Sequence, residues 1–209
     1  MSILVLDLHR KDRIEAVKIN KQLDKYTNST LLRLFSPDFS HDILKSYDGI
    51  VLSGSDDMSV YSDQKVRHLG IHLRTLSNEG TQILGICGGN QLLAKTYGYR
   101  RYRLKEPEVG WQQIILTEQG KSDPLFSGLE DSFFASEQHI LAVRCDDRDR
   151  ILAENKKCVQ AIRYQPTVRG VQFHPEESLA NGIELLKTEK HQVWIIFSNF
   201  VNMAKHAGS

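Results

Sequence analysis

The sequence predicts an α/β fold, a doubly wound open sheet with a β-rich second half. In the first half, short apolar runs alternate with amphipathic segments, as in strands joined by crossover helices in a largely parallel sheet. After Tyr99 the pattern changes to short strand-like runs with little helix between them. A length of 209 residues suits one domain with a sizeable core, so we expect a single domain over residues 1–209.

The first strand and the first helix show how elements are assigned in the first half. Ile3–Leu8 is a nearly continuous apolar run, which predicts a strand covered on both faces. Ile14–Tyr26 predicts a helix with Ile14, Val17 and Leu23 facing the core. On the same grounds we expect strands over Thr30–Phe35, Gly49–Leu52 and Gln82–Ile86, a short helix around Ile43, and helices over Gln64–Asn78 and from Asn90 onward.

The second half predicts mainly strands. Val168–Phe173 is an apolar strand that Pro175 ends, because proline lacks the N–H that a strand ladder needs. A closing helix is predicted over Gln192–Ala204. The other expected strands cover Trp111–Thr117, Ser132–Ala135, Ala142–Cys145, Ile151–Ala153 and Val159–Tyr164.

The composition excludes several classes of function. The 27 Lys and Arg residues nearly balance the 26 Asp and Glu residues, so no global field attracts nucleic acid or anionic lipid. No apolar run has the length of a signal peptide or a membrane span. Cys87, Cys145 and Cys158 fit neither a disulfide framework nor a zinc site, and His68 and His72 lack a third ligand. We therefore expect a cytoplasmic protein that uses no metal or cofactor and has no nucleic-acid or membrane partner.

The glycine-rich stretch around Cys87 is the most informative part of the sequence. Gly85-Ile86-Cys87-Gly88-Gly89 joins a predicted buried strand to a predicted helix, which is the glycine pattern of a nucleophile elbow. The glycines allow the two backbones to approach, and the residue at the apex is pushed outward. A cysteine at a helix N-terminus is favoured as the thiolate. The alternative is a loop that cradles a phosphate, which needs no cysteine and usually has a lysine nearby.

A second motif supplies a base for this nucleophile. In the run GVQFHPE, His174 follows a strand, and Glu176 lies two residues further on. Residues two apart in an extended segment face the same way, so the Glu176 carboxylate can reach the His174 imidazole and fix its tautomer. Cys87, His174 and Glu176 therefore fit the roles of nucleophile, base and orienting acid in a catalytic triad.

These motifs resemble those of a known family. GICGGNQ is similar to the nucleophile motif of class I glutamine amidotransferases, and GVQFHPEES is similar to their His/Glu motif. The resemblance extends over nearly the whole chain, and residues 107–129 resemble the GMP-synthase-like branch. It implies the flavodoxin-like fold of these glutaminases, in which a cysteine attacks the side-chain amide of glutamine, ammonia leaves, and water hydrolyses a glutamyl thioester.

The resemblance also implies the residues that bind substrate. Gln91 matches a glutamine-contacting residue, and Gly88 matches one of the two oxyanion-hole donors. The second donor comes from a Ser-Gly-Gly-Pro loop in the family, which is Ser53-Gly54-Ser55-Asp56 here, so either Gly54 or Ser55 supplies it. A positive φ at Ser55 would be strained. His139 aligns with a histidine of the GMP-synthase-like branch, but the aspartate expected two residues later is Leu141.

The favoured interpretation is a glutaminase that passes ammonia to a synthetase on another chain, because the sequence contains no ATP-binding synthetase motif. One alternative is a γ-glutamyl peptide hydrolase with the same triad. Another is a non-catalytic, partner-binding subunit that has lost its oxyanion hole. The basic run Arg100, Arg101, Arg103 and Lys105 is either a solvated strand edge or a docking surface for a partner or anionic substrate.

Overall fold

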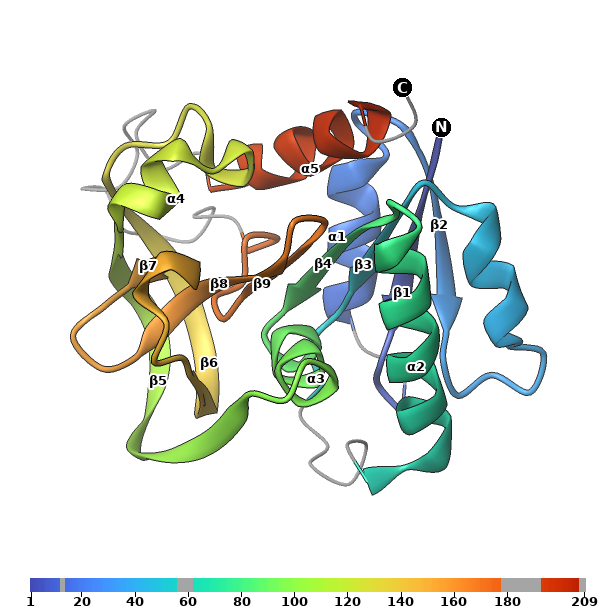
Figure 1. The fold of residues 1–209 in the computed structure, drawn as a ribbon, viewed down its shortest axis with the longest axis horizontal. Helices are drawn as coiled ribbons and strands as arrows, with labels where there is room; N and C mark the ends of the chain where they lie inside the picture. The colour runs from blue at the N-terminus through green and yellow to red at the C-terminus, as the bar shows by residue number, and fades with distance from the viewer. Residues whose placement is uncertain (12–13, 56–61, 178–192, 207–209) are drawn as a thin grey trace.

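The computed structural model describes residues 1–11, 14–55, 62–177 and 193–206. In this part of the chain nine strands form one mixed sheet (Figure 1). In spatial order the strands are β2 (Asn28–Arg33), β1 (Ser2–Asp7), β3 (Gly49–Leu52), β4 (Gln82–Ile86), β9 (Val168–Val171), β8 (Val159–Gln165), β7 (Ile151–Glu154), β5 (Arg100–Leu116) and β6 (Ser132–Arg144).

Strand direction divides this sheet into two halves. The pairs from β2 to β9 are all parallel. The pairs from β9 to β6 are all antiparallel. The predicted fold class, a doubly wound sheet with a β-rich second half, is confirmed.

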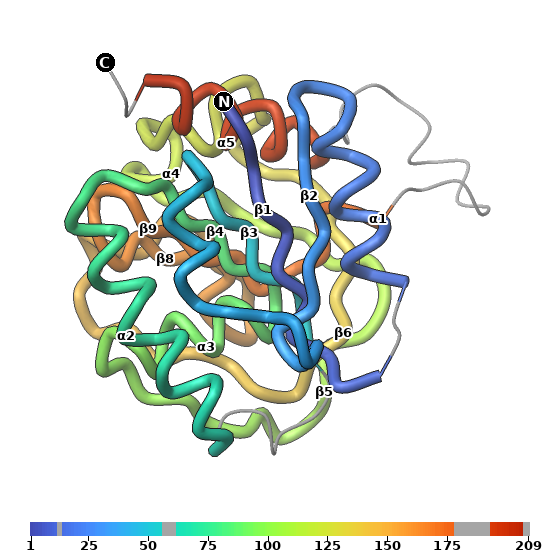
Figure 2. Tube along the Cα trace, turned by 90° about the vertical axis from the view of Figure 1, so that its right-hand side faces the viewer, coloured from blue at the N-terminus to red at the C-terminus, as the bar shows by residue number. Residues whose placement is uncertain are grey.

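Helices cover both faces of the parallel half. Along β1, Ile3 and Val5 belong to one apolar core and Leu4 and Leu6 to the other, because successive strand side chains point to opposite faces. Helices α1 (Ile14–Leu23) and α5 (Ile195–His206) pack in the first core. Helices α2 (Gln64–Asn78) and α3 (Gly88–Thr96) pack in the second, and Figure 2 shows α1 and α2 on opposite sides of the strands.

The predicted core face of α1 is wrong in part. Leu23 is buried, but Ile14 is 62% exposed and Val17 is 51% exposed. The buried stripe consists of Ala16, Ile19 and Leu23. Residues 14 and 16 lie about 200° apart around a helix, so a helix that docks through Ala16 turns Ile14 to the opposite side.

The antiparallel strands are longer than predicted. β5 begins at Arg100, and β6 runs without interruption through the segment between the two short strands predicted there. Their polar residues conceal the strands in the sequence, because one face of this hairpin is exposed. The chain also forms α4 (Glu118–Ser122) and the 3-10 turns η1 (His41–Ser46), η3 (Pro124–Phe126) and η4 (Arg148–Arg150). Among the described residues, no helix combines the length and the apolar character needed to span a bilayer.

Candidate active site

Segments that follow the parallel strands meet at the carboxyl edge of the sheet. They enclose a small pocket of about 100 Å³. Ligands bind at this edge in open α/β sheets, because the loops after neighbouring strands converge there. The pocket is lined by His9, Glu15, Gly54, Ser55, Cys87, Gln138 and His174.

Cys87 occupies the turn between β4 and α3. Its φ of 50° and ψ of −103° make it the one non-glycine residue in the described ranges with a positive φ. Such backbone conformations cost about 1–3 kcal/mol and persist where the surroundings impose them. The Cys87 amide donates to the Val171 carbonyl at 2.8 Å, which ties the apex of the turn to β9. Cys87 is 7% exposed and lies at the N-terminus of α3.

The glycines around Cys87 are required by close backbone approach. A Cβ on Gly85 would lie 2.6 Å from the carbonyl carbon of Gly89. A Cβ on Gly89 would lie 2.5 Å from the carbonyl oxygen of Leu52. Neither position has room for a side chain, so these glycines allow α3 to start directly against β3 and β4.

His174 and Glu176 form a buried hydrogen-bonded pair. The distance from His174 Nδ1 to Glu176 Oε1 is 2.7 Å, and the two residues are 7% and 3% exposed. Because an ionised carboxylate only accepts, this bond places a proton on Nδ1 and leaves Nε2 for the nucleophile. Burial alone would lower the pKa of His174, but the Cys87 sulfur and the Glu176 carboxylate raise it well above its ordinary value.

The loop after β3 packs against the elbow. A Cβ on Gly88 would lie 2.2 Å from the backbone nitrogen of Ser55 and 2.9 Å from the carbonyl carbon of Gly54. The three candidate oxyanion residues are therefore adjacent. The strain expected at Ser55 is absent, since neither Gly54 nor Ser55 is among the described residues with positive φ. Asp56, also in this loop, lies outside the described residues.

Gln91 is buried in the first turns of α3. Its Nε2 donates to the Leu141 carbonyl at 3.1 Å, and the residue is 5% exposed. Leu141 occupies the position at which the GMP-synthase-like branch has an aspartate. In this chain the position contributes its backbone carbonyl instead.

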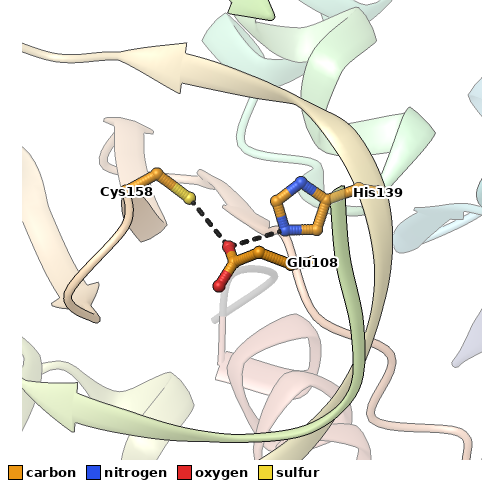
Figure 3. Close-up of side chains that lie close together, drawn as sticks. All are labelled: Glu108, His139 and Cys158. Carbon is orange, nitrogen blue, oxygen red and sulfur yellow. Dashed lines mark hydrogen bonds and ion pairs between the residues drawn. The ribbon is translucent and has the colours of Figure 1, made fainter. Parts of the chain in front are cut away.

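His139 lies in a buried cluster of polar groups (Figure 3). Its Nε2 is 3.1 Å from Glu108 Oε2 and 3.1 Å from Glu137 Oε2. Burial alone would lower the pKa of His139, but these two carboxylates raise it to about 9. For Glu108, burial would raise the pKa, but hydrogen bonds from His139, Asn155 and Cys158 lower it to about 2.

Three donors of this cluster also have the spacing of metal ligands. The ligand atoms of Glu108, His139 and Cys158 lie within 4.8 Å of one another. Hydrogen bonds account for this arrangement without an ion, since Glu108 accepts from Cys158 Sγ at 3.2 Å and from Gln160 Nε2 at 3.0 Å. Burial, followed by the Glu108 carboxylate, raises the pKa of the Cys158 thiol, which opposes metal binding through a thiolate.

The sequence interpretation missed residues that the fold brings to the pocket. Gln172 Nε2 lies 3.6 Å from Cys87 Sγ, and the Gln138 carbonyl oxygen lies 4.0 Å from the same sulfur. Gln172 could have been identified from the sequence, because it lies two residues before His174 in an extended segment and therefore faces the same way. His9 follows β1 at the same sheet edge. Gln138 had no comparable signal, because its position depends on how the antiparallel half folds back.

The remaining candidates lie away from this pocket. Arg100 and Arg101 line a separate pocket of about 560 Å³ beside Arg144, Lys156 and Lys157. The rings of His41 and His72 stack at 5.0 Å. Among the described residues, neither His41 nor His72 belongs to a set of side chains with metal-ligand spacing. Cys145 and Cys158 are free thiols.

Comparison with known proteins identifies the family. Residues 14–192 match the family model described as Glutamine amidotransferase class-I. The chain is 34% identical over 158 residues to the glutamine-hydrolyzing GMP synthase subunit of Sulfurisphaera tokodaii, which covers 74% of this chain and 81% of the relative. It is 29% identical over 163 residues to imidazole glycerol phosphate synthase subunit HisH of Pyrococcus furiosus, covering 69% and 81% of the two chains.

The fold agrees with the sequence match. The crystal structure of a glutamine amidotransferase from Thermotoga maritima is similar with a TM-score of 0.74 at 19% identity, over 97% of this chain and 98% of that one. The protein belongs to the class I glutamine amidotransferase family.

Proposed function

We propose that this protein is a glutaminase domain that hydrolyses the side-chain amide of glutamine and releases ammonia for an acceptor enzyme on another chain. Cys87 is the nucleophile, His174 is the general base and acid, and Glu176 orients the imidazole. The observation that carries the proposal is the arrangement of His174. It is hydrogen bonded to Glu176 at 2.7 Å and lines the same pocket as Cys87 at the strained elbow.

The reaction has two halves. In the first, His174 Nε2 takes the Cys87 proton and the sulfur adds to the amide carbon of glutamine. The imidazolium returns the proton to the amide nitrogen, the C–N bond breaks, and ammonia leaves a glutamyl thioester. In the second, His174 takes a proton from water as the water oxygen attacks the thioester carbon. The C–S bond breaks, the sulfur regains the proton, and glutamate leaves.

Both halves pass through a tetrahedral oxyanion. The backbone N–H groups of Gly88 and of the Gly54–Ser55 loop are the proposed donors, because these segments are in contact beside Cys87. Losing one such donor typically reduces kcat about a hundred- to a thousandfold.

The relatives support a partner in trans. The S. tokodaii relative is named as a glutamine-hydrolysing subunit of GMP synthase, and the P. furiosus relative is named as a subunit of imidazole glycerol phosphate synthase. We infer that this chain likewise works beside a synthase subunit that consumes the ammonia.

Labelling and turnover test the proposal. A glutamine-like electrophile should modify Cys87, and Cys87→Ala should lose both the adduct and glutamine hydrolysis. Cys145→Ala is the matched control, because Cys145 is a buried free thiol outside the pocket and should retain both. An adduct on another cysteine, or turnover that survives in Cys87→Ala, contradicts the proposed nucleophile. Turnover on a γ-glutamyl peptide but not on glutamine would identify a peptide hydrolase instead.

A further inference from the structure

A buried polar cluster lies directly behind the strand that lines the candidate pocket. On β6, Glu137 and His139 are 1% and 7% exposed, whereas Gln138 between them is exposed. Side chains alternate along a strand, so the cluster occupies one side of β6 and the Gln138 side chain the other. The Gln138 carbonyl approaches Cys87 Sγ at 4.0 Å, and the His174 amide donates to the Ser136 carbonyl at 2.8 Å. This segment of β6 therefore forms a wall of the pocket.

Glu108 reaches the cluster from the neighbouring strand. It is paired with His139 in the register of β5 and β6. Four β5 residues, 104–107, lie opposite the single β6 residue 140, so the register shifts immediately before Glu108. The Glu108 side chain is inaccessible, while its neighbour Val109 is 64% exposed. The irregular pairing thus brings a carboxylate into the interior beside His139.

The contacts of His139 define its protonation. Nδ1 lies 3.0 Å from the Leu141 carbonyl oxygen, which can only accept, so Nδ1 carries a proton. Nε2 faces the two carboxylates at 3.1 Å each. A neutral ring protonated on Nδ1 would direct a lone pair at both of them. The imidazolium donates to the Leu141 carbonyl from Nδ1 and places its positive charge beside both carboxylates, 3.1 Å from each.

The Leu141 carbonyl connects this cluster to Gln91. It accepts from His139 Nδ1 at 3.0 Å and from Gln91 Nε2 at 3.1 Å. The position of this one oxygen therefore depends on His139, and the orientation of the Gln91 amide depends on the oxygen. His139 and Gln91 both lie outside the lining of the pocket, and Gln91 is the residue that the resemblance matches to a glutamine-contacting position.

We propose that His139 is a positioning residue for glutamine binding. Glu108 and Glu137 hold its imidazolium, and the ring fixes the Leu141 carbonyl that orients Gln91. This inference rests on the proposed function. By its match to a glutamine-contacting residue, Gln91 would touch the substrate equally before and during the reaction, so a loss of its orientation would weaken binding of glutamine and leave the chemical step unchanged.

Two conservative substitutions separate the contacts of His139. In His139→Asn the amide nitrogen can occupy the place of Nδ1 and keep the bond to Leu141. In His139→Gln it can occupy the place of Nε2 and keep the carboxylate contacts while losing the bond to Leu141. We expect His139→Gln to raise KM for glutamine about tenfold with kcat within about threefold, and His139→Asn to raise KM less than about threefold.

Asp123→Asn is the matched control for a purely structural effect. Asp123 and Arg169 form another buried ion pair, at 2.7 Å, and neither residue lines the candidate pocket. The variant should lower the melting temperature and leave KM unchanged. If KM is the same in His139→Gln as in the wild type, or if His139→Gln changes only the melting temperature as Asp123→Asn does, the positioning role is wrong.

Calorimetry keeps the inference separate from the catalytic proposal. In a Cys87→Ala background, adding His139→Gln should weaken glutamine binding about tenfold whether or not the chain turns over. Glutamine binding without turnover in the wild type would reject the catalytic proposal alone, and no glutamine binding at all would reject both.

Metal analysis of the purified protein tests whether the cluster around His139 binds a metal ion. If the protein contains one equivalent of bound metal and Glu108→Gln removes it, the cluster is a metal site and the proposed role of His139 is wrong.

Discussion

His174 Nδ1 lies 2.7 Å from Glu176 Oε1, and both residues are buried at the carboxyl edge of the sheet. Glu177, the next residue, points elsewhere and pairs with Lys18 at 2.7 Å. Two adjacent glutamates therefore have different partners. This difference provides an internal control for the proposed triad.

The triad predicts unequal effects at these two glutamates. Glu176→Gln should lower kcat by two to four orders of magnitude, because the neutral amide stabilises the imidazolium less and permits the wrong tautomer. Glu177→Gln should stay within about threefold of the wild type, because it removes a partly exposed ion pair with little effect on His174. Steady-state kinetics with glutamine check both. A larger loss in Glu177→Gln would mean that the orienting carboxylate has been assigned to the wrong residue.

The oxyanion loop predicts a steric effect at Gly88. In Gly88→Ala the new methyl group would lie 2.2 Å from the Ser55 nitrogen, so the loop has to move. We expect kcat to fall about a hundred- to a thousandfold with little change in KM, because the donors act on the transition state. In Gly54→Ala the nearest atoms are 3.6 Å and 3.9 Å away, an ordinary contact, and the loss should be much smaller. Equal losses in the two variants would contradict the proposed packing of this loop.

The pKa of His139 predicts a pH dependence of stability. A folded-state pKa of about 9 lies above the ordinary 6.5, so the folded protein binds the proton more tightly than the unfolded chain. The stabilisation is complete below pH 6.5 and is lost as pH rises through 9, by about 3 kcal/mol from this group. His174, whose pKa is also raised, acts in the same direction. Denaturant unfolding at a series of pH values measures the total.

An NMR titration isolates the contribution of His139. Its imidazole should titrate near pH 9. His41 is the comparison within the same sample, since burial lowers its pKa below the ordinary value. Titration of His139 near 6.5 would mean that the two carboxylates do not hold it as an imidazolium.

The buried pair of Asp123 and Arg169 predicts a loss of stability without a loss of binding. Asp123 Oδ1 accepts from Arg169 Nε at 2.7 Å and from the Leu125 amide at 3.0 Å, which caps η3. Asp123→Asn keeps an acceptor for the cap but removes the charge that faces the guanidinium. Breaking a buried ion pair in this way should lower the free energy of unfolding by about 3–5 kcal/mol. Chemical denaturation checks the value, and a change below about 1 kcal/mol would show that the pair behaves as a solvated one.

The parallel half of the fold and the residues of the candidate triad could be predicted from the sequence. Nearly continuous apolar runs and amphipathic runs with period 3.6 are local signals, and they placed β1, β3, β4 and α2 with the boundaries that the structure has to within a residue or two. The Cys87 elbow and the His174 motif were equally local. In both motifs the chemistry depends on neighbours within a few positions along the chain.

Features that depend on contacts between distant segments could not be predicted from the sequence. Ile14 and Ala16 are apolar residues on opposite sides of the same helix. The docking of the helix on the sheet buries Ala16 and leaves Ile14 exposed. Gln138 reached Cys87, and Glu108 reached His139, because β5 and β6 fold back over the end of the sheet with an irregular register. A shift of one residue in a strand moves each side chain to the other face, so register decides whether a charged residue is solvated or buried. Nothing local in the sequence encodes that register, which is set by the packing of the whole antiparallel half.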